Sequence, residues 1–324
     1  MLDLSIARRW SFWLQLFLSL LILLLLSLDS QITDIQSALS KSSWYWLGAA
    51  LLLKLVTLFI HEFRLWLALT EPRPPIAQTM TIGFASGAIN LVLPGRAGDI
   101  AAIAMLQKVC RLKPGVAAYA IGMASFFEAA LFGLMLMGVF ILGANQWEAA
   151  LGTLEHARAL NWVSGATLGG IVVVILAAIV GNRLKGEPDE PEDGFSIRQF
   201  ITDAFRETGT ALRSPKYIAL NILVAGIEVW GMVFSFALGF WALGIDIPTP
   251  WTAAAVMLGF SALAAVILPP TYGAGPAAAA VFILSLFGIP QSTALAYAAL
   301  WWIISQIPCA FIGIPCIWLL KGAD

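Results

Sequence analysis

Long apolar runs separated by short polar segments dominate the hydropathy pattern of the chain. Many of these runs reach about 18 residues with few charges, the length that an α-helix needs to cross a bilayer. The apolar positions are continuous rather than alternating, so a transmembrane β-barrel is excluded. The pattern therefore predicts an all-α polytopic membrane protein with full spans at residues 10–28, 44–62, 116–143, 162–180, 216–243 and 291–319.

Two further apolar stretches, 76–109 and 251–288, are too long for one span and are broken near their centres. The breaks are Leu93-Pro94-Gly95 and Leu268-Pro269-Pro270. Proline interrupts helical hydrogen bonding, so we expect Pro94, Gly95, Pro269 and Pro270 to act as structural hinges. Each stretch could be one kinked span, or a re-entrant hairpin whose two short arms enter and leave on the same side.

The distribution of basic residues favours the hairpins, because cytoplasmic loops are enriched in Lys and Arg. With two hairpins and a cytoplasmic N-terminus, Lys41 and Arg158 are the only basic residues on the outer side of the membrane. A single crossing by each stretch would instead move the basic loop from Arg183 to Lys216 outside. We therefore predict six spans, two re-entrant hairpins and cytoplasmic termini. The cytoplasmic set is then Arg8, Arg9, Arg64, Arg73, Lys108, Arg111, Lys113, Arg183, Lys185, Arg198, Arg206, Arg213, Lys216 and Lys321.

The loop at 181–215 is the largest polar segment. Its first portion, 187–193, reads as an acidic linker. Its second portion predicts an interfacial amphipathic helix that lies on the cytoplasmic leaflet with its arginines near anionic headgroups. The alternative is a helix packed on the protein's own cytoplasmic loops. The predicted apolar face comprises Ile197, Phe200, Ile201, Ala204, Phe205, Thr208, Ala211 and Leu212.

The two broken stretches also resemble each other in sequence. Gly83-Phe84-Ala85-Ser86 precedes the first break, and Gly259-Phe260-Ser261-Ala262 precedes the second. Downstream, Ala118-Tyr119-Ala120 corresponds to Ala296-Tyr297-Ala298. Three spans separate the hairpins, so the second copy would be inverted, an arrangement common in secondary transporters. We expect residues 1–180 to hold the first half and the start of the second, and 216–324 to hold the remainder.

Charged residues within apolar segments mark the candidate binding site, because a charge at the bilayer centre costs about 2.5–3.5 kcal/mol. Arg96 and Asp99 stand at the first hairpin tip, where Gly98 and Asp99 could begin a half-helix whose amides attract an anion. Arg96 would suit a phosphate there, although a simple Arg96–Asp99 pair is the alternative. The second tip, Tyr272-Gly273, carries no charge.

Glu128 and Glu228 lie near the middle of their spans. Either could offset Arg96, contact a cationic headgroup, carry a coupling proton or make an interhelical hydrogen bond. His61, Glu62 and Arg64 fall near the end of the second span, where we expect them to anchor the chain at the interface. The predicted substrate-binding set is Asn90, Arg96, Gly98, Asp99, Glu128, Glu228, Tyr272 and Gly273.

Composition narrows the function further. Only 11% of the residues are charged and 60% are hydrophobic, whereas soluble domains carry about 25% charged residues. Nucleic acid is not expected as a partner. We also predict no metal, no cofactor and no catalytic residue. The two histidines, His61 and His156, are expected at opposite membrane faces, and the chain has no phosphate-loop or dinucleotide motif.

The run from Asn90 to Asp99, read as N-x-x-x-P-G-R-x-G-[DE], resembles the membrane region of lysyl-phosphatidylglycerol synthases and their stand-alone relatives. By this resemblance, Arg96 and Asp99 match the motif's charged positions, Arg64 matches an arginine ending the second span, and Glu128 a span glutamate. The chain departs from the family pattern at Ala129, Ala277-Ala278 and Trp301-Trp302, where charged residues are common. A strongly charged headgroup is therefore less expected.

The resemblance implies an inner-membrane protein that moves or accommodates lipids. No aminoacyl-transferase domain follows in this sequence, so lysyl transfer and other enzymatic activity are not expected. We predict a flippase-like transporter that binds a polar or phosphate-bearing headgroup of a phospholipid or polyprenyl or terpenoid lipid at its hairpin tips. The alternative is a non-transporting scaffold or regulator of a lipid- or glycan-synthesising enzyme. Association with such an enzyme or with a second copy stays open.

Overall fold

The protein is described by a computed structural model that covers residues 10–27, 32–70, 73–93, 97–183, 197–267 and 273–321. Within these ranges all regular structure is helical and no strand is present. The helices are α1 (Trp10–Ser27), α2 (Ile32–Ser40), α3 (Trp44–Ala68), α4 (Ile76–Val92), α5 (Ala97–Cys110), α6 (Pro114–Leu142), α7 (Ala144–Leu151), α8 (Thr153–Arg183), α9 (Ile197–Ala211), α10 (Pro215–Ala242), α11 (Pro250–Ile267), α12 (Ala274–Ser285) and α13 (Gln291–Lys321).

Five helices in the described part of the chain, α3, α6, α8, α10 and α13, are long and apolar enough to cross a membrane. They contain 25 to 31 residues, or about 37–46 Å of helix at 1.5 Å per residue, against a hydrocarbon core of about 30 Å. These helices confirm the prediction of a multi-pass helical membrane protein. The first predicted span corresponds to α1, which has 18 residues.

Each broken stretch forms two helices, α4 with α5 and α11 with α12. The second helix of each pair is short, with 14 residues in α5 and 12 in α12, or about 21 and 18 Å. Neither α5 nor α12 therefore has the length to cross the hydrocarbon core. The predicted hinges Pro94, Gly95, Pro269 and Pro270 lie outside the described residues.

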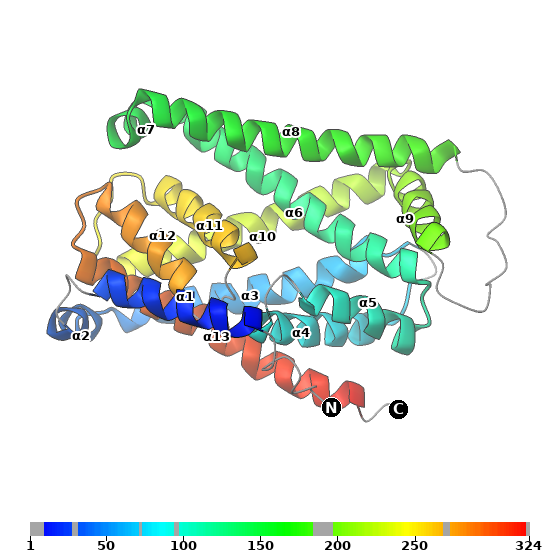
Figure 1. Cartoon of the computed structure of the whole chain (residues 1–324), viewed down its shortest axis with the longest axis horizontal. Helices are drawn as coiled ribbons and strands as arrows, with labels where there is room; N and C mark the ends of the chain where they lie inside the picture. Colours follow the sequence, from blue (N-terminus) through cyan, green and yellow to red (C-terminus); the bar gives the residue numbers. More distant parts are fainter. Residues whose placement is uncertain are drawn as a thin grey trace. The chain divides into compact units, whose positions relative to one another are not determined.

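The described residues divide into two compact units that interleave along the sequence. The first unit comprises residues within 1–55, 88–97 and 232–310. In it, α12 packs against α11 and α1 (Figure 1). Alanines such as Ala253, Ala254 and Ala280 are buried, and small side chains allow such helices to approach closely. Tyr297 of α13 is also buried and donates a hydrogen bond to the Phe236 carbonyl of α10 at 2.9 Å.

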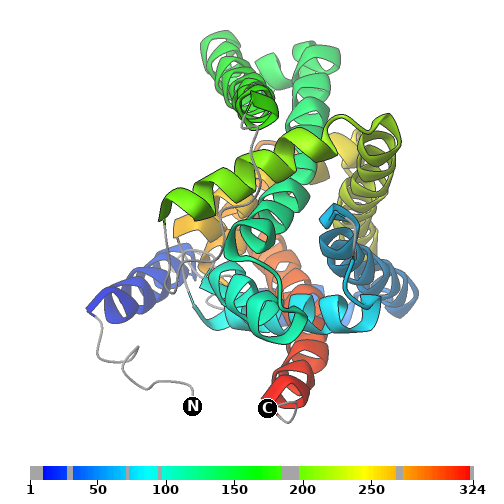
Figure 2. The same ribbon diagram turned by 90° about the vertical axis from the view of Figure 1, so that its right-hand side faces the viewer.

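The second unit comprises residues within 56–87, 98–231 and 311–324. Its helices α6, α8 and α9 pack on one another; α9 lies near the C-terminal end of α8 (Figure 1) and crosses α6 (Figure 2). Gly115 of α6 and Gly181 of α8 permit these contacts, because a β-carbon at either would overlap the backbone of α9. The predicted amphipathic helix therefore forms and packs partly on α6 and α8, whereas its place on the cytoplasmic leaflet stays a prediction.

Not all of the apolar face of α9 is covered. Ala211 and Thr208 are buried, whereas Ile197 and Ile201 are exposed.

The second unit also contains a chain of hydroxyl contacts, in which Tyr119 and Tyr217 hydrogen-bond at 2.8 Å and Tyr217 donates to the Ala68 carbonyl at 3.1 Å. These bonds tie α6 and α10 to the C-terminal end of α3.

Candidate functional site

Ionisable side chains from α3, α6 and α10 meet inside the second unit. His61 and Arg64 are three residues apart on α3, a spacing that places both on one face of a helix. Glu128 lies near the midpoint of α6, and Glu228 lies near the midpoint of α10. The four residues are named the charge cluster here. Both glutamates stand about 20 Å from the ends of helices long enough to cross a membrane.

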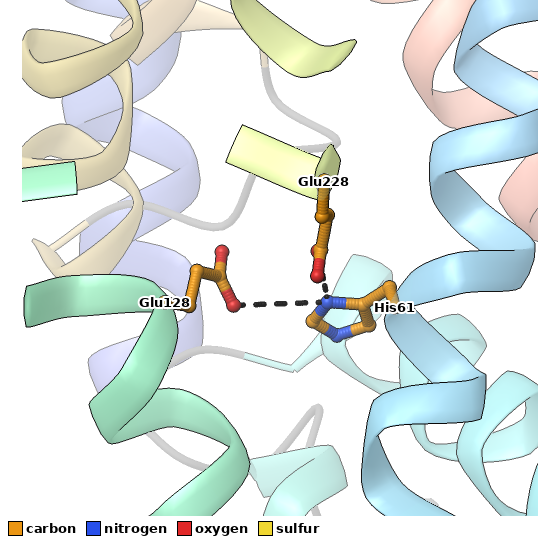
Figure 3. Close-up of side chains that lie close together, drawn as sticks. All are labelled: His61, Glu128 and Glu228. Carbon is orange, nitrogen blue, oxygen red and sulfur yellow. Dashed lines mark hydrogen bonds and ion pairs between the residues drawn. The ribbon is translucent and has the colours of Figure 1, made fainter. Parts of the chain in front are cut away.

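Arg64 joins the two glutamates. Its Nη1 donates to Glu128 Oε2 at 3.1 Å and also to Glu228 Oε2, while its Nη2 donates to the Ala124 carbonyl. The Nδ1 of His61 lies 2.8 Å from Glu228 Oε1 and 3.7 Å from Glu128 Oε2 (Figure 3). The cluster is thus a closed network in which Glu228 uses one oxygen for Arg64 and the other for His61.

The members of the charge cluster differ sharply in exposure. The side chains of Arg64 and Glu228 are each 1% exposed, whereas those of His61 and Glu128 are 47% and 27% exposed. Arg64 and Glu228 are therefore the buried support of the network. His61 and Glu128 form the part that another molecule can reach. Among the described residues, the buried Nε of Arg64 has no hydrogen-bond partner.

His61, Glu128 and Glu228 also have the donor set of a metal site. Their ligand atoms lie within 4.8 Å of one another, and imidazole with carboxylate is a common combination for divalent transition metals. However, the Arg64 guanidinium already bonds one oxygen of each glutamate. A divalent cation would have to sit beside this fixed positive charge. The residues present therefore fit an internal ion-pair network better than they fit a metal.

The structure brings Glu128 and Glu228 together, although the sequence left their partners open. The prediction that Glu62 and Arg64 anchor the chain at the interface is wrong, because both side chains are buried, at 4% and 1% exposure. The apolar helix α3 continues to Ala68 rather than ending near residue 62. His61 and Arg64 are three residues apart and are followed by further apolar residues. This pattern could have indicated that both lie on one face of a helix that continues beyond them.

The remaining predicted site residues belong to the hairpin tips. Asp99 lies in the first turn of α5 and is partly buried, and the preceding Gly98 is buried. Asn90 is a partly buried residue of α4. Gly273 precedes α12 with a φ of 69°, a left-handed conformation that glycine adopts without steric cost. Arg96 and Tyr272 lie outside the described residues, and binding by this set stays a prediction.

A comparison with known protein families matches residues 12–313 to the family described as the lysylphosphatidylglycerol synthase TM region. The chain belongs to this family. The match covers most of the sequence and confirms the resemblance drawn from the Asn90–Asp99 motif. Neither the curated proteins nor the solved structures yielded a match.

Membership of the lysylphosphatidylglycerol synthase TM region family agrees with the five long apolar helices. Together they establish a multi-pass membrane protein with a lipid-related role. Among the ion pairs of the described residues, the pair in the charge cluster is the most buried, since the side chains of Arg64 and Glu228 are each 1% exposed.

Proposed function

We propose that the protein translocates a membrane lipid between leaflets and binds its polar or phosphate-bearing headgroup on the way. The observation that carries the proposal is the charge cluster, which lies along long apolar helices of a lipid-related membrane family. Each charge at membrane depth costs about 2.5–3.5 kcal/mol, and such residues commonly mark substrate paths. Four ionisable groups gathered there favour a transport role over simple packing.

In this proposal the headgroup meets the reachable part of the cluster. Glu128 accepts hydrogen bonds from a headgroup hydroxyl or ammonium, and His61 supplies a second polar contact. The hairpin tips, with Arg96, Asp99 and Gly98 on one side and Tyr272 and Gly273 on the other, would bind a phosphate where one is present. Arg64 and Glu228 hold the cluster in shape.

The helix arrangement supports alternating access between inverted halves. The short α5 and α12 suit the second arms of two re-entrant hairpins. In addition, Tyr119 and Tyr297 occupy matching places in the proposed repeat. The Tyr119 hydroxyl bonds through Tyr217 to the carbonyl of Ala68 near the end of α3, and the Tyr297 hydroxyl bonds the carbonyl of Phe236 in α10. With α1 as the sixth span, both termini would lie in the cytoplasm.

A leaflet assay tests the proposed transport. The purified protein is reconstituted in liposomes with a fluorescent phospholipid or polyprenyl phosphate, and loss of fluorescence from the outer leaflet is followed after adding a membrane-impermeant quencher. We expect Arg96→Ala and Glu128→Gln to slow translocation about tenfold or more, because each removes a charged hydrogen bond worth about 1.5–3 kcal/mol.

Arg158→Ala serves as the matched control. Arg158 pairs with Glu155 at 2.5 Å on an exposed part of α8, so its removal should leave the rate unchanged. If protein-free liposomes, the native protein and all variants move the lipid equally fast, transport is contradicted and the scaffold alternative is favoured.

A further inference from the structure

Glu62 is a buried carboxylate that the charge cluster does not use. It is 4% exposed on α3, and no residue in the described part of the chain forms a hydrogen bond or ion pair with it. Its carboxylate lies against the backbone of α4, where a β-carbon at Gly83 would overlap the Glu62 oxygen. An ionised carboxylate buried without a donor is strongly unfavourable, so Glu62 needs a proton or a cation.

The described residues around Glu62 supply little positive charge. The charged or titratable groups among them that face it are His61 on its own helix, Glu228 on α10, Asp99 on α5 and Cys316 on α13. Two of these four are carboxylic acids. The Arg64 guanidinium, two residues along α3, is already taken by Glu128, Glu228 and the Ala124 carbonyl.

Counting charges shows what the region lacks. Glu62, Glu128 and Glu228 are three carboxylates, and Arg64 is the one permanent cation of the charge cluster. Asp99, which faces Glu62, is a fourth carboxylate, so even with His61 protonated the negative charges of these described groups outnumber the positive ones. Glu62, for which the described residues supply no hydrogen-bond donor, is the natural place for a proton that reduces this excess of negative charge.

We propose that Glu62 is a proton-binding site and that its protonation couples lipid movement to the transmembrane proton gradient. This inference rests on the proposed transport function. The chemistry is the formation and release of one carboxyl O–H bond, with the proton taken up from one side of the membrane and released to the other. His61, the exposed neighbour of Glu62, is the group through which the proton reaches it.

The test measures lipid translocation by reconstituted protein with a pH gradient imposed in either direction. If one proton moves with each lipid, a gradient of one pH unit can hold the ratio of lipid between the two leaflets about tenfold away from equality. We therefore expect the inner-to-outer ratio of the labelled phospholipid to shift by up to about tenfold with the native protein, and to relax when a protonophore is added.

Glu62→Gln mimics the protonated carboxyl in shape and should fold, yet it should abolish the response to the gradient. Glu62→Asp keeps a titratable group and should keep part of the response, which guards against a folding defect in the glutamine variant. Glu155→Gln is the matched control, because Glu155 is 56% exposed and its variant should respond as the native protein does.

The outcomes separate the two proposals. Translocation that ignores the pH gradient, or that follows a sodium gradient instead, overturns proton coupling and leaves the transport function standing. A Glu62→Gln variant that still responds to the pH gradient overturns the assignment to Glu62. Absence of protein-dependent lipid movement in every sample overturns the transport function together with the coupling that rests on it.

Discussion

At the scale of single residues, Arg64 is the side chain on which the charge cluster depends. It bonds Glu128 and Glu228, which lie 64 and 164 residues away in the chain. Glu228 is almost fully buried, so its negative charge is tolerable only with Arg64 and His61 beside it. The sequence identified both glutamates as candidates, but it could not identify their partner, because pairing depends on how three distant helices pack.

We expect Arg64→Ala to destabilise the protein by about 3–5 kcal/mol, because it leaves the Glu228 carboxylate buried without its guanidinium. Thermal unfolding in detergent, followed by tryptophan fluorescence, measures the change. Arg158→Ala removes an ion pair whose side chains are 59% and 56% exposed, and should cost less than about 1 kcal/mol.

A second substitution tests whether the unpaired Glu228 carboxylate causes the loss of stability. Arg64→Ala combined with Glu228→Gln removes the unpaired charge and should recover part of the lost stability. Equal stability losses in Arg64→Ala and Arg158→Ala would contradict the view that the buried network stabilises the fold.

At the scale of elements, glycine positions decide where α9 docks. The amphipathic pattern predicted this helix from sequence, and the helix forms at Ile197–Ala211. The pattern could not indicate which helices of the protein α9 contacts, since any apolar surface can cover an apolar face. The docking on α6 and α8 is visible only in the contacts of Gly115 and Gly181 with the α9 backbone.

Gly181→Ala should therefore weaken the docking of α9. The added β-carbon would overlap the Phe205 carbonyl, and we expect a stability loss of about 1–3 kcal/mol with faster amide exchange in α9. Gly169→Ala is the matched control in α8, because a β-carbon there meets nothing within 4 Å. It should be neutral or slightly stabilising. Identical unfolding and exchange in the two variants would contradict the docking argument.

At the scale of the whole molecule, the number of crossings decides the topology. Five long helices are clear, α1 is shorter, and the helix pairs α4/α5 and α11/α12 contain short second helices. The basic loop after Arg183 lies in the cytoplasm if both pairs are re-entrant, and outside if each pair crosses once. Labelling from one side of the membrane distinguishes these topologies.

We expect a cysteine at Asp189 to react only from the cytoplasmic side and a cysteine at Leu154 only from the opposite side. The native Cys110, Cys309 and Cys316 are first replaced by serine or alanine to remove background labelling. Reaction of the Asp189 position from outside would show that the first broken stretch crosses the membrane and would contradict the first hairpin.

The sequence by itself determined the class of protein and where along the chain its long helices lie, because hydropathy acts within one segment. It did not determine their ends, since α3 continues to Ala68. It also marked Glu128 and Glu228, since a carboxylate in an apolar run stands out without any knowledge of packing. Tertiary structure alone decided that Arg64 and His61 close the network and that Glu62 is buried against Gly83. Those facts depend on side chains that distant helices bring together, and no local pattern records them.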